Sequence, residues 1–192
     1  MNREPRHAQA VRDESVLILT PLKDAAPHLD TYCRLLATLT YPRRLISLGF
    51  LESDSRDDTV ARLQVELKRL RREFAGADLW RHDFGFVLPP GMHRSDPRIQ
   101  PQRRSVLARA RNHLLSHALR EQDWVLWLDV DLIFYPPDII ERLLDAGKAI
   151  VQPHCVLDPG GPTFDQNGWR DKGRYHLDDL RDEGMIVPLD AV

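Results

Sequence analysis

The stretch that decides the fold is Asp123-Trp124-Val125-Leu126-Trp127-Leu128-Asp129-Val130-Asp131-Leu132, an apolar run that ends abruptly in two carboxylates. Its length and composition predict one strand buried on both faces of a sheet, and α/β proteins bind ligands just beyond the carboxyl ends of such strands. Because alternate residues of an extended chain point to opposite sides, Asp129 and Asp131 are predicted to share one side. Two acids placed in this way repel each other, and a hard divalent cation held by oxygen ligands would relieve the repulsion.

The Asp-x-Asp pattern is weak evidence by itself, because a buried strand can also end in two solvated acids that bind nothing. Both interpretations are open at this point, and the rest of the chain has to decide between them.

The composition is that of an ordinary globular chain, with 42% hydrophobic and 29% charged residues in 192. A chain of this length fits one domain that buries about 70% of its unfolded surface. We predict a loose tail over residues 1–14 and one domain over residues 15–192. The formal net charge of −2 argues against a general nucleic-acid binder.

Neither the cysteine spacing nor the hydropathy of the sequence indicates a metal cluster or a membrane-spanning segment. Cys33 and Cys155 are far apart without metal-ligand spacing, so both are predicted to be packing residues, although a single disulfide is left open. No run reaches the roughly 18 apolar residues of a membrane span, and the first fourteen residues lack the apolar centre of a signal peptide. These features predict a cytoplasmic protein without a membrane span.

Strand and helix patterns alternate along the chain. Strands are expected at residues 15–20, 45–51, 79–84, 123–128 and 149–152, with a last one starting near 185. Helices are expected after Asp24 or Pro27, after Asp57 or Asp58, over residues 103–119, and from the first-turn prolines Pro136 and Pro137 to Gly147. Residues 85–102 are expected to form a long loop.

This alternation predicts an α/β fold with a mostly parallel sheet and helices on both faces. Right-handed crossovers would bring the strand ends at Thr20, Glu52 and Asp129 to one edge of the sheet, where a ligand should lie.

The helix that follows Asp58 carries a basic face. Its residues are Arg62, Lys68, Arg69, Arg71 and Arg72, with Glu66 and Glu73 interspersed. Such a face can bind nucleic acid, but with acids among the bases it is more typical of a solvated surface, so no nucleic-acid partner is predicted.

Taken together, several stretches resemble the fungal mannan-polymerase mannosyltransferases, a family of GT-A-like glycosyltransferases. The resemblance runs from about Val16 to Asp190. The stretches that carry it are Ile18–Leu22, Ser53–Ser55 with Asp58–Thr59, Arg104–Ser105, Ala108–Asn112, Trp127–Asp131, Tyr135–Ile140 and Asp165–Trp169.

The resemblance implies a GT-A-like, Rossmann-like nucleotide-sugar-binding domain and a hexosyltransferase that uses Mn²⁺ or Mg²⁺. GDP-mannose is the favoured donor, a UDP-sugar is the alternative, and a glycan or another hydroxyl compound is the acceptor. Members of the family retain the anomeric configuration, but the residues themselves do not decide between retention and inversion.

Candidate roles follow for individual residues. Asp131 and Asp129 are the candidate catalytic and metal-binding residues, because a cation there would stabilise the diphosphate leaving group, and Asp129 could instead accept from the ribose hydroxyls. Arg111 and Asn112 have donors suited to phosphate oxygens.

The remaining candidates concern the nucleoside and the sugar. Asp54, beside Ser53, would accept from the base or ribose, or belong to a helix-capping loop. Thr20 and Pro21 would line the nucleoside pocket mainly by their backbone. A substrate loop is expected at Asp165, Asn167 and Trp169, where Trp169 stacks on a sugar or packs as a plug.

Two departures from the family bear on activity. Family members usually carry an N-terminal membrane anchor, reside in the Golgi and continue well past the equivalent of Asp190. The sequence leaves three expectations open, namely a product truncated at its C-terminus, a fragment, or a donor-binding half that needs more chain, and catalytic competence is left open with them.

Two other functions remain as alternatives. A catalytically inactive donor-binding or scaffold domain would keep the fold without turnover. A nucleotidyltransferase also places acids after a strand, but it usually has a glycine-rich phosphate loop that Pro21-Leu22-Lys23-Asp24 lacks. The sequence does not reveal the oligomeric state.

Overall fold

The computed structural model describes residues 13–92, 96–158, 160–161, 181–182 and 185–186. Two compact units share the chain. The first consists of Met1–Gly85 and Ala108–Pro137, and the second of Phe86–Leu107 and Asp138–Val192. Each unit is described by itself below.

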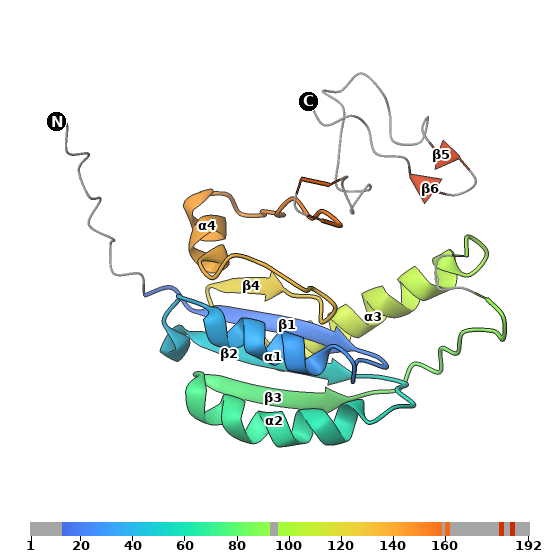
Figure 1. Ribbon diagram of the computed structural model, residues 1–192, viewed down its shortest axis with the longest axis horizontal. Coiled ribbons are helices and arrows are strands. Elements are labelled where there is room, and N and C mark those ends of the chain that lie inside the picture. Colours follow the sequence, from blue (N-terminus) through green and yellow to red (C-terminus); the bar gives the residue numbers. More distant parts are fainter. Residues whose placement is uncertain (1–12, 93–95, 159, 162–180, 183–184, 187–192) are drawn as a thin grey trace. The chain divides into compact units, whose positions relative to one another are not determined.

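The first unit is built on a four-stranded sheet in the order β3-β2-β1-β4 (Figure 1). Its strands are β1 (Val16–Leu22), β2 (Ile46–Glu52), β3 (Gly76–Arg81) and β4 (Trp124–Trp127). Every pair of neighbours is parallel. Parallel strands need helical crossovers that cover the sheet, which explains why β1 reads as a continuous apolar run with every residue buried except Pro21.

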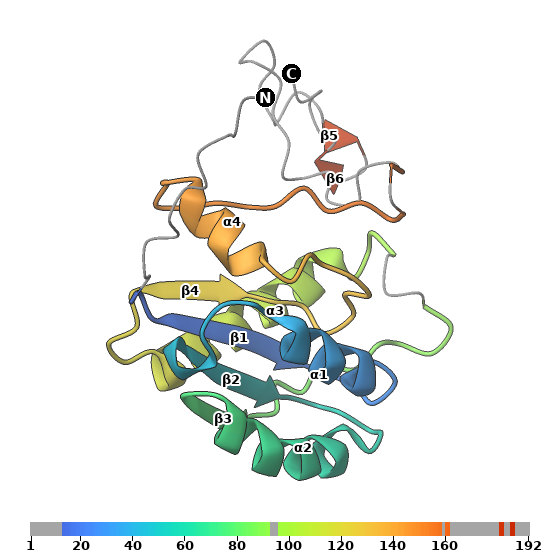
Figure 2. The ribbon, with the colours of Figure 1, turned by 60° about the vertical axis from the view of Figure 1, so that its left-hand side comes forward.

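Helices cover both faces of this sheet (Figure 2). On one face, the rings of Tyr32 in α1 (Leu29–Thr38) and Phe50 in β2 pack edge to face, with their centroids 6.1 Å apart. The next residue of β2, Leu51, points to the other face and belongs to the same apolar cluster as Leu114 and Ala118 of α3 (Gln100–Ala118). The predicted α/β class, with a mostly parallel sheet between helices, is confirmed.

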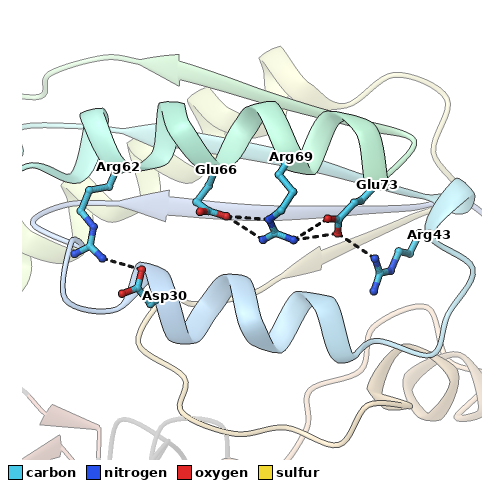
Figure 3. Close-up of polar contacts among 6 residues, drawn as sticks. All are labelled: Asp30, Arg43, Arg62, Glu66, Arg69 and Glu73. Atoms are coloured by element: carbon cyan, nitrogen blue, oxygen red, sulfur yellow. Dashed lines mark hydrogen bonds and ion pairs between the residues drawn. The ribbon is translucent and has the colours of Figure 1, made fainter.

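Helix α2 (Thr59–Glu73) lies beside α1, and ion pairs occupy much of its basic face (Figure 3). Arg62 reaches Asp30 of α1 at 2.7 Å, and Arg69 is held between Glu66 at 2.9 Å and Glu73 at 3.0 Å. Glu73 also binds Arg43 of the 3₁₀ turn η1 (Arg43–Leu45) at 3.0 Å. Arg62 and Arg43 therefore join α2 to neighbouring elements, whereas Arg69 pairs within α2.

The second unit contains the start of α3, helix α4 (Ile139–Asp145) and a short antiparallel pair, β5 (Arg181–Asp182) and β6 (Met185–Ile186). Gly147 follows α4 with φ of +60°, which is the left-handed conformation that favours glycine after a helix.

Several predicted boundaries are wrong. Pro136 and Pro137 precede the N-cap Asp138 instead of forming the first turn of α4. Residues 149–152 are a bend followed by irregular chain, and Ile150 is 91% exposed, so its apolar side chain is not buried as a strand would require. Strand β3 starts at Gly76, three residues earlier than expected, and α3 starts at Gln100.

The acidic-tipped strand also differs from the prediction. All four residues of β4 are only half-buried, because β4 pairs with β1 alone at the edge of the described sheet. Cys33 is buried and Cys155 is half-buried, and no disulfide joins them, so the disulfide that was left open is not formed. Within the described ranges, none of the helices is both long and apolar enough to cross a bilayer.

A glycine in β2 permits the close approach of α3. A Cβ atom added to Gly49 would lie 2.7 Å from Leu19 Cδ2 and 3.1 Å from Ala118 Cβ. We predict that Gly49→Ala lowers the free energy of unfolding by about 1–3 kcal/mol, because the extra methyl group overpacks this layer. Urea denaturation measures the change. Gly76→Ala is the matched strand control, since nothing lies within 4 Å of its Cβ position, and equal losses in both variants would contradict the packing argument.

Candidate functional site

The site lies at the carboxyl edge of the sheet in the first unit, where β1 determines the place at which β4 ends. The Thr20 hydroxyl, fully buried, donates to the Leu128 carbonyl at 2.9 Å and shares a 2.6 Å hydrogen bond with the Tyr32 hydroxyl. The Leu128 N–H donates to the Leu19 carbonyl at 3.1 Å. Burial raises the pKa of Tyr32, so its hydroxyl stays protonated and available for this bond.

Asp129 and Asp131 follow directly after this anchored position. Both are exposed, and Val130 and Asp131 form a turn. The alternation of an extended strand therefore stops before the pair, contrary to the geometry predicted from their spacing. Asp131 makes no hydrogen bond or ion pair with the described residues, whereas Asp129 is engaged by an arginine.

That arginine is Arg111 of α3. Its Nη2 lies 3.4 Å from Asp129 Oδ1, and its guanidinium stacks over the Trp127 ring at 5.4 Å from the ring centre. Its Nε is buried without a hydrogen-bond partner among the described residues. A guanidinium held on an aromatic face with unused N–H groups is suited to bind an anion such as phosphate. Asn112, the next residue, is exposed.

The Ser53-Asp54-Ser55 loop continues β2. Asp54 has a left-handed backbone with φ of +54°. Its carboxylate accepts the N–H groups of Phe84 and Gly85 at 3.0 Å each, and its own N–H donates to Asp83 at 2.8 Å. Asp54 thus ties the end of β2 to the chain that follows β3. It is not a helix cap, because the first N–H of α2 donates to Asp57 instead.

The other nucleoside candidates lie at the same edge. Ser53 is buried, and its N–H donates to the Leu22 carbonyl at 3.0 Å. Pro21 is half-buried and lies opposite Leu51 in the β1–β2 register. Thr20, Pro21, Ser53, Asp54, Arg111 and Asp129 therefore all lie at this edge of the first unit. Asp165, Asn167 and Trp169 lie outside the described residues.

The two carboxylates suit a divalent cation as part of a larger ligand set. No group of three or more His, Cys, Asp or Glu side chains that could hold a metal ion occurs among the residues that the structure describes. Mg²⁺, however, is usually bound in nucleotide enzymes by one or two carboxylates, with water and substrate phosphates completing the set. Asp129 and Asp131 fit that arrangement by their chemistry.

Sequence reasoning missed a row of stacked rings on α3 and the chain after β3. His113 stacks on His82 at 4.5 Å and on His117 at 4.1 Å between ring centres. Phe84 meets His82 edge to face, and Arg109 lies over the Phe84 ring. The one available signal was the i, i+4 spacing of His113 and His117, which places both on one helix face.

Comparisons with known proteins identify the family. The Anp1 family model matches residues 2–188, and the chain belongs to the Anp1 family. This confirms the resemblance to the mannan-polymerase proteins.

Three relatives are named as subunits of mannan polymerase complexes. The ANP1 subunit of mannan polymerase II from Saccharomyces cerevisiae is 34% identical, and the corresponding anp1 subunit from Schizosaccharomyces pombe is 38% identical. The MNN9 subunit from Candida albicans is 32% identical. Each alignment covers 91% of this chain but only 38%, 44% and 51% of the respective relative, so the chain spans about half their length or less.

Among solved structures, residues 1–349 of Staphylococcus aureus TarS in complex with UDP match with a TM-score of 0.44 and 17% identity, over 69% of this chain and 31% of that one.

The histidine row predicts a pH dependence of stability. Burial, and then the positive charges of His117 and His82, lower the pKa of His113 below its usual 6.5. A folded-state pKa below the unfolded value means that the stabilisation is complete above pH 6.5 and is lost as the pH falls through the folded pKa.

Between pH 7.5 and 5.5, the melting temperature of the wild type should therefore fall further than that of His113→Gln, because only the wild type loses the stabilisation that depends on neutral His113. Differential scanning fluorimetry in matched buffers measures the difference. His28→Gln, which removes an exposed histidine outside the row, should follow the wild type. A wild-type curve parallel to that of His113→Gln would show that the protonation of His113 is not linked to folding.

Proposed function

We propose that this chain is the donor-binding portion of a metal-dependent GT-A glycosyltransferase. The enzyme would transfer a hexose, most simply mannose from GDP-mannose, to a glycan or another hydroxyl acceptor. One observation carries the proposal: in a member of the Anp1 family, Arg111 is held between Trp127 and Asp129 at the carboxyl edge of a parallel sheet. Family relatives named as mannan polymerase subunits support mannose as the sugar.

The residues at the edge have distinct tasks in this proposal. Breaking the anomeric bond leaves a nucleoside diphosphate whose negative charge has to be stabilised as it develops. The fork of Arg111 would bind the diphosphate oxygens, and the exposed amide of Asn112 can donate to the same group. Binding of phosphate would replace the exposed ion pair between Arg111 and Asp129, which contributes little stability by itself.

Mn²⁺ or Mg²⁺ held by Asp131 and Asp129 would supply Lewis-acid stabilisation to the leaving diphosphate. The nucleoside would lie over the ends of β1 and β2, against Pro21, Ser53 and the backbone of the loop that Asp54 fixes. Since the Asp54 oxygens already accept two backbone N–H groups, we infer that Asp54 shapes this pocket rather than reading the base through its carboxylate.

The metal role of Asp131 is tested by substitution. Asp131→Asn should weaken GDP binding in the presence of Mn²⁺ by about tenfold or more, because a charged ligand is lost. Isothermal titration calorimetry gives the affinity with and without Mn²⁺. Asp145→Asn, a change of another exposed acid, is the control. Unchanged affinity in Asp131→Asn would contradict the metal role.

The role of Arg111 is tested by comparing two ligands. Arg111→Ala should weaken the binding of GDP by about tenfold or more, and that of guanosine much less, since a guanidinium–phosphate contact is lost only with GDP. Arg111→Lys should recover part of the affinity, because it keeps the charge but not the fork. Arg72→Ala, on the exposed face of α2, is the control. If Arg111→Ala lost the same affinity for guanosine as for GDP, Arg111 would not be a phosphate-binding residue.

Incubation with labelled GDP-mannose and Mn²⁺ separates the proposed activity from the alternatives. Transfer to an added mannoside, or slow hydrolysis to mannose and GDP, supports a glycosyltransferase. Binding without either reaction identifies an inactive donor-binding domain. In a separate incubation with GTP, mannose 1-phosphate and Mn²⁺, release of pyrophosphate with formation of GDP-mannose identifies a nucleotidyltransferase.

A further inference from the structure

Buried polar side chains in the described part of the chain gather at one place. They are Thr20, Glu52, Ser53 and Thr59, all at the carboxyl ends of β1 and β2 or at the start of α2. Burial of polar groups opposes stability unless each finds a partner. Their concentration beside the candidate site indicates that these groups shape the site.

Glu52 is the charged member of this group. It is the last residue of β2 and only 1% exposed. Its Oε1 accepts the Ser55 N–H at 3.0 Å, and its Oε2 accepts Nε of Arg81, the last residue of β3, at 3.0 Å. The Arg81 side chain is 62% exposed, so water solvates the cation while the carboxylate stays in the core. Removing one partner of a buried ion pair is strongly destabilising when the other charge is left buried, but the Arg81 cation would remain in water.

The loop that Glu52 holds is strained. Besides the Ser53 N–H bond to the Leu22 carbonyl and the Phe84 and Gly85 N–H bonds to the Asp54 carboxylate, its remaining hydrogen bonds lie in exposed surroundings. Asp54 adopts a left-handed backbone, which persists in a non-glycine residue only when its surroundings impose it. Lys23 donates to the Asp54 carbonyl, the Asp54 N–H donates to Asp83, and the Asp24 N–H donates to the Ser55 hydroxyl, all in exposed surroundings. Water competes for those bonds, whereas the bond from Ser55 to the Glu52 carboxylate starts from the core.

We propose that Glu52 is a positioning residue, which holds the Ser53-Asp54-Ser55 loop in the conformation that binds the nucleoside of the donor. This inference rests on the proposed function. Glu52 does not touch the ligand; it acts through the Ser55 N–H and thereby through the strained backbone of Asp54. Its carboxylate is retained in the core because the loop needs an acceptor at that position.

The test compares two variants of the full 192-residue chain. Glu52→Met removes the acceptor and leaves no buried charge behind, since Arg81 is solvated. We expect it to bind GDP with Mn²⁺ at least tenfold more weakly, with a melting temperature no lower than that of the wild type. Glu52→Gln keeps an amide oxygen for the Ser55 N–H and should bind within about threefold of the wild type.

Glu66→Gln is the matched control, because Glu66 pairs with Arg69 within α2 and not with the loop (Figure 3). Its affinity for GDP should equal that of the wild type. The positioning role would be overturned if Glu52→Met bound GDP as tightly as the wild type, or if Glu52→Met and Glu52→Gln lost the same affinity. In either case the affinity for GDP would not follow the presence of the Ser55 hydrogen bond.

Amide hydrogen exchange tests the same bond without any ligand. The Ser55 amide of the wild type should exchange slowly, and this protection should be lost in Glu52→Met. A Ser55 amide that exchanges in the wild type as fast as an unfolded chain would overturn the inference even if Glu52→Met did not fold. Failure of the wild type to bind GDP would instead refute the proposed function, and this inference with it, whereas normal wild-type binding with an unaffected Glu52→Met refutes the inference alone.

Discussion

Parallel pairing in register is the constraint on which the rest of this structure depends. Val16 lies opposite Ile46 on one side and Trp124 on the other, so β1, β2 and β4 run together toward one edge of the sheet. The buried Thr20 hydroxyl then fixes Leu128, and Asp129 emerges beyond it. With either neighbour antiparallel, the acids after β4 and the loop after β2 would lie at opposite edges, and no ligand could meet both.

The interactions that stabilise this edge of the sheet differ from those in the rest of the first unit. Elsewhere the buried residues of the strands are apolar, and charged groups of α1 and α2 form ion pairs near the surface (Figure 3). At the carboxyl edge, buried hydroxyl and carboxyl groups replace apolar ones. They join neighbouring loops, as in the bond from the Ala25 N–H to the Thr59 hydroxyl. Groups held in this way are preorganised, so binding a ligand requires little further ordering of the chain.

Periodicity in the sequence was sufficient to predict the strands, the helices and their parallel arrangement, because apolar spacing reports burial. It failed for residues 149–152, where an apolar run stays exposed, and for Asp131, where a turn ends the alternation. The role of Asp54 could not be predicted, because its partners Phe84 and Gly85 are about thirty positions away and only the register of β2 with β3 brings them together. Arg111 was predicted from the resemblance and its residue type, but its stacking on Trp127 required the fold.

The most direct measurement of the central claim, that a metal-bound nucleotide lies across the carboxyl edge of the sheet, is the NMR spectrum of backbone amides with GDP and substoichiometric Mn²⁺. Paramagnetic broadening should be greatest at residues 129–131 and should extend to residues 53–55, while amides at the amino end of β1, near Val16, keep their intensity. Broadening centred on the amino ends of the strands, or a spectrum that GDP leaves unchanged at residues 53–55 and 129–131, would contradict the account.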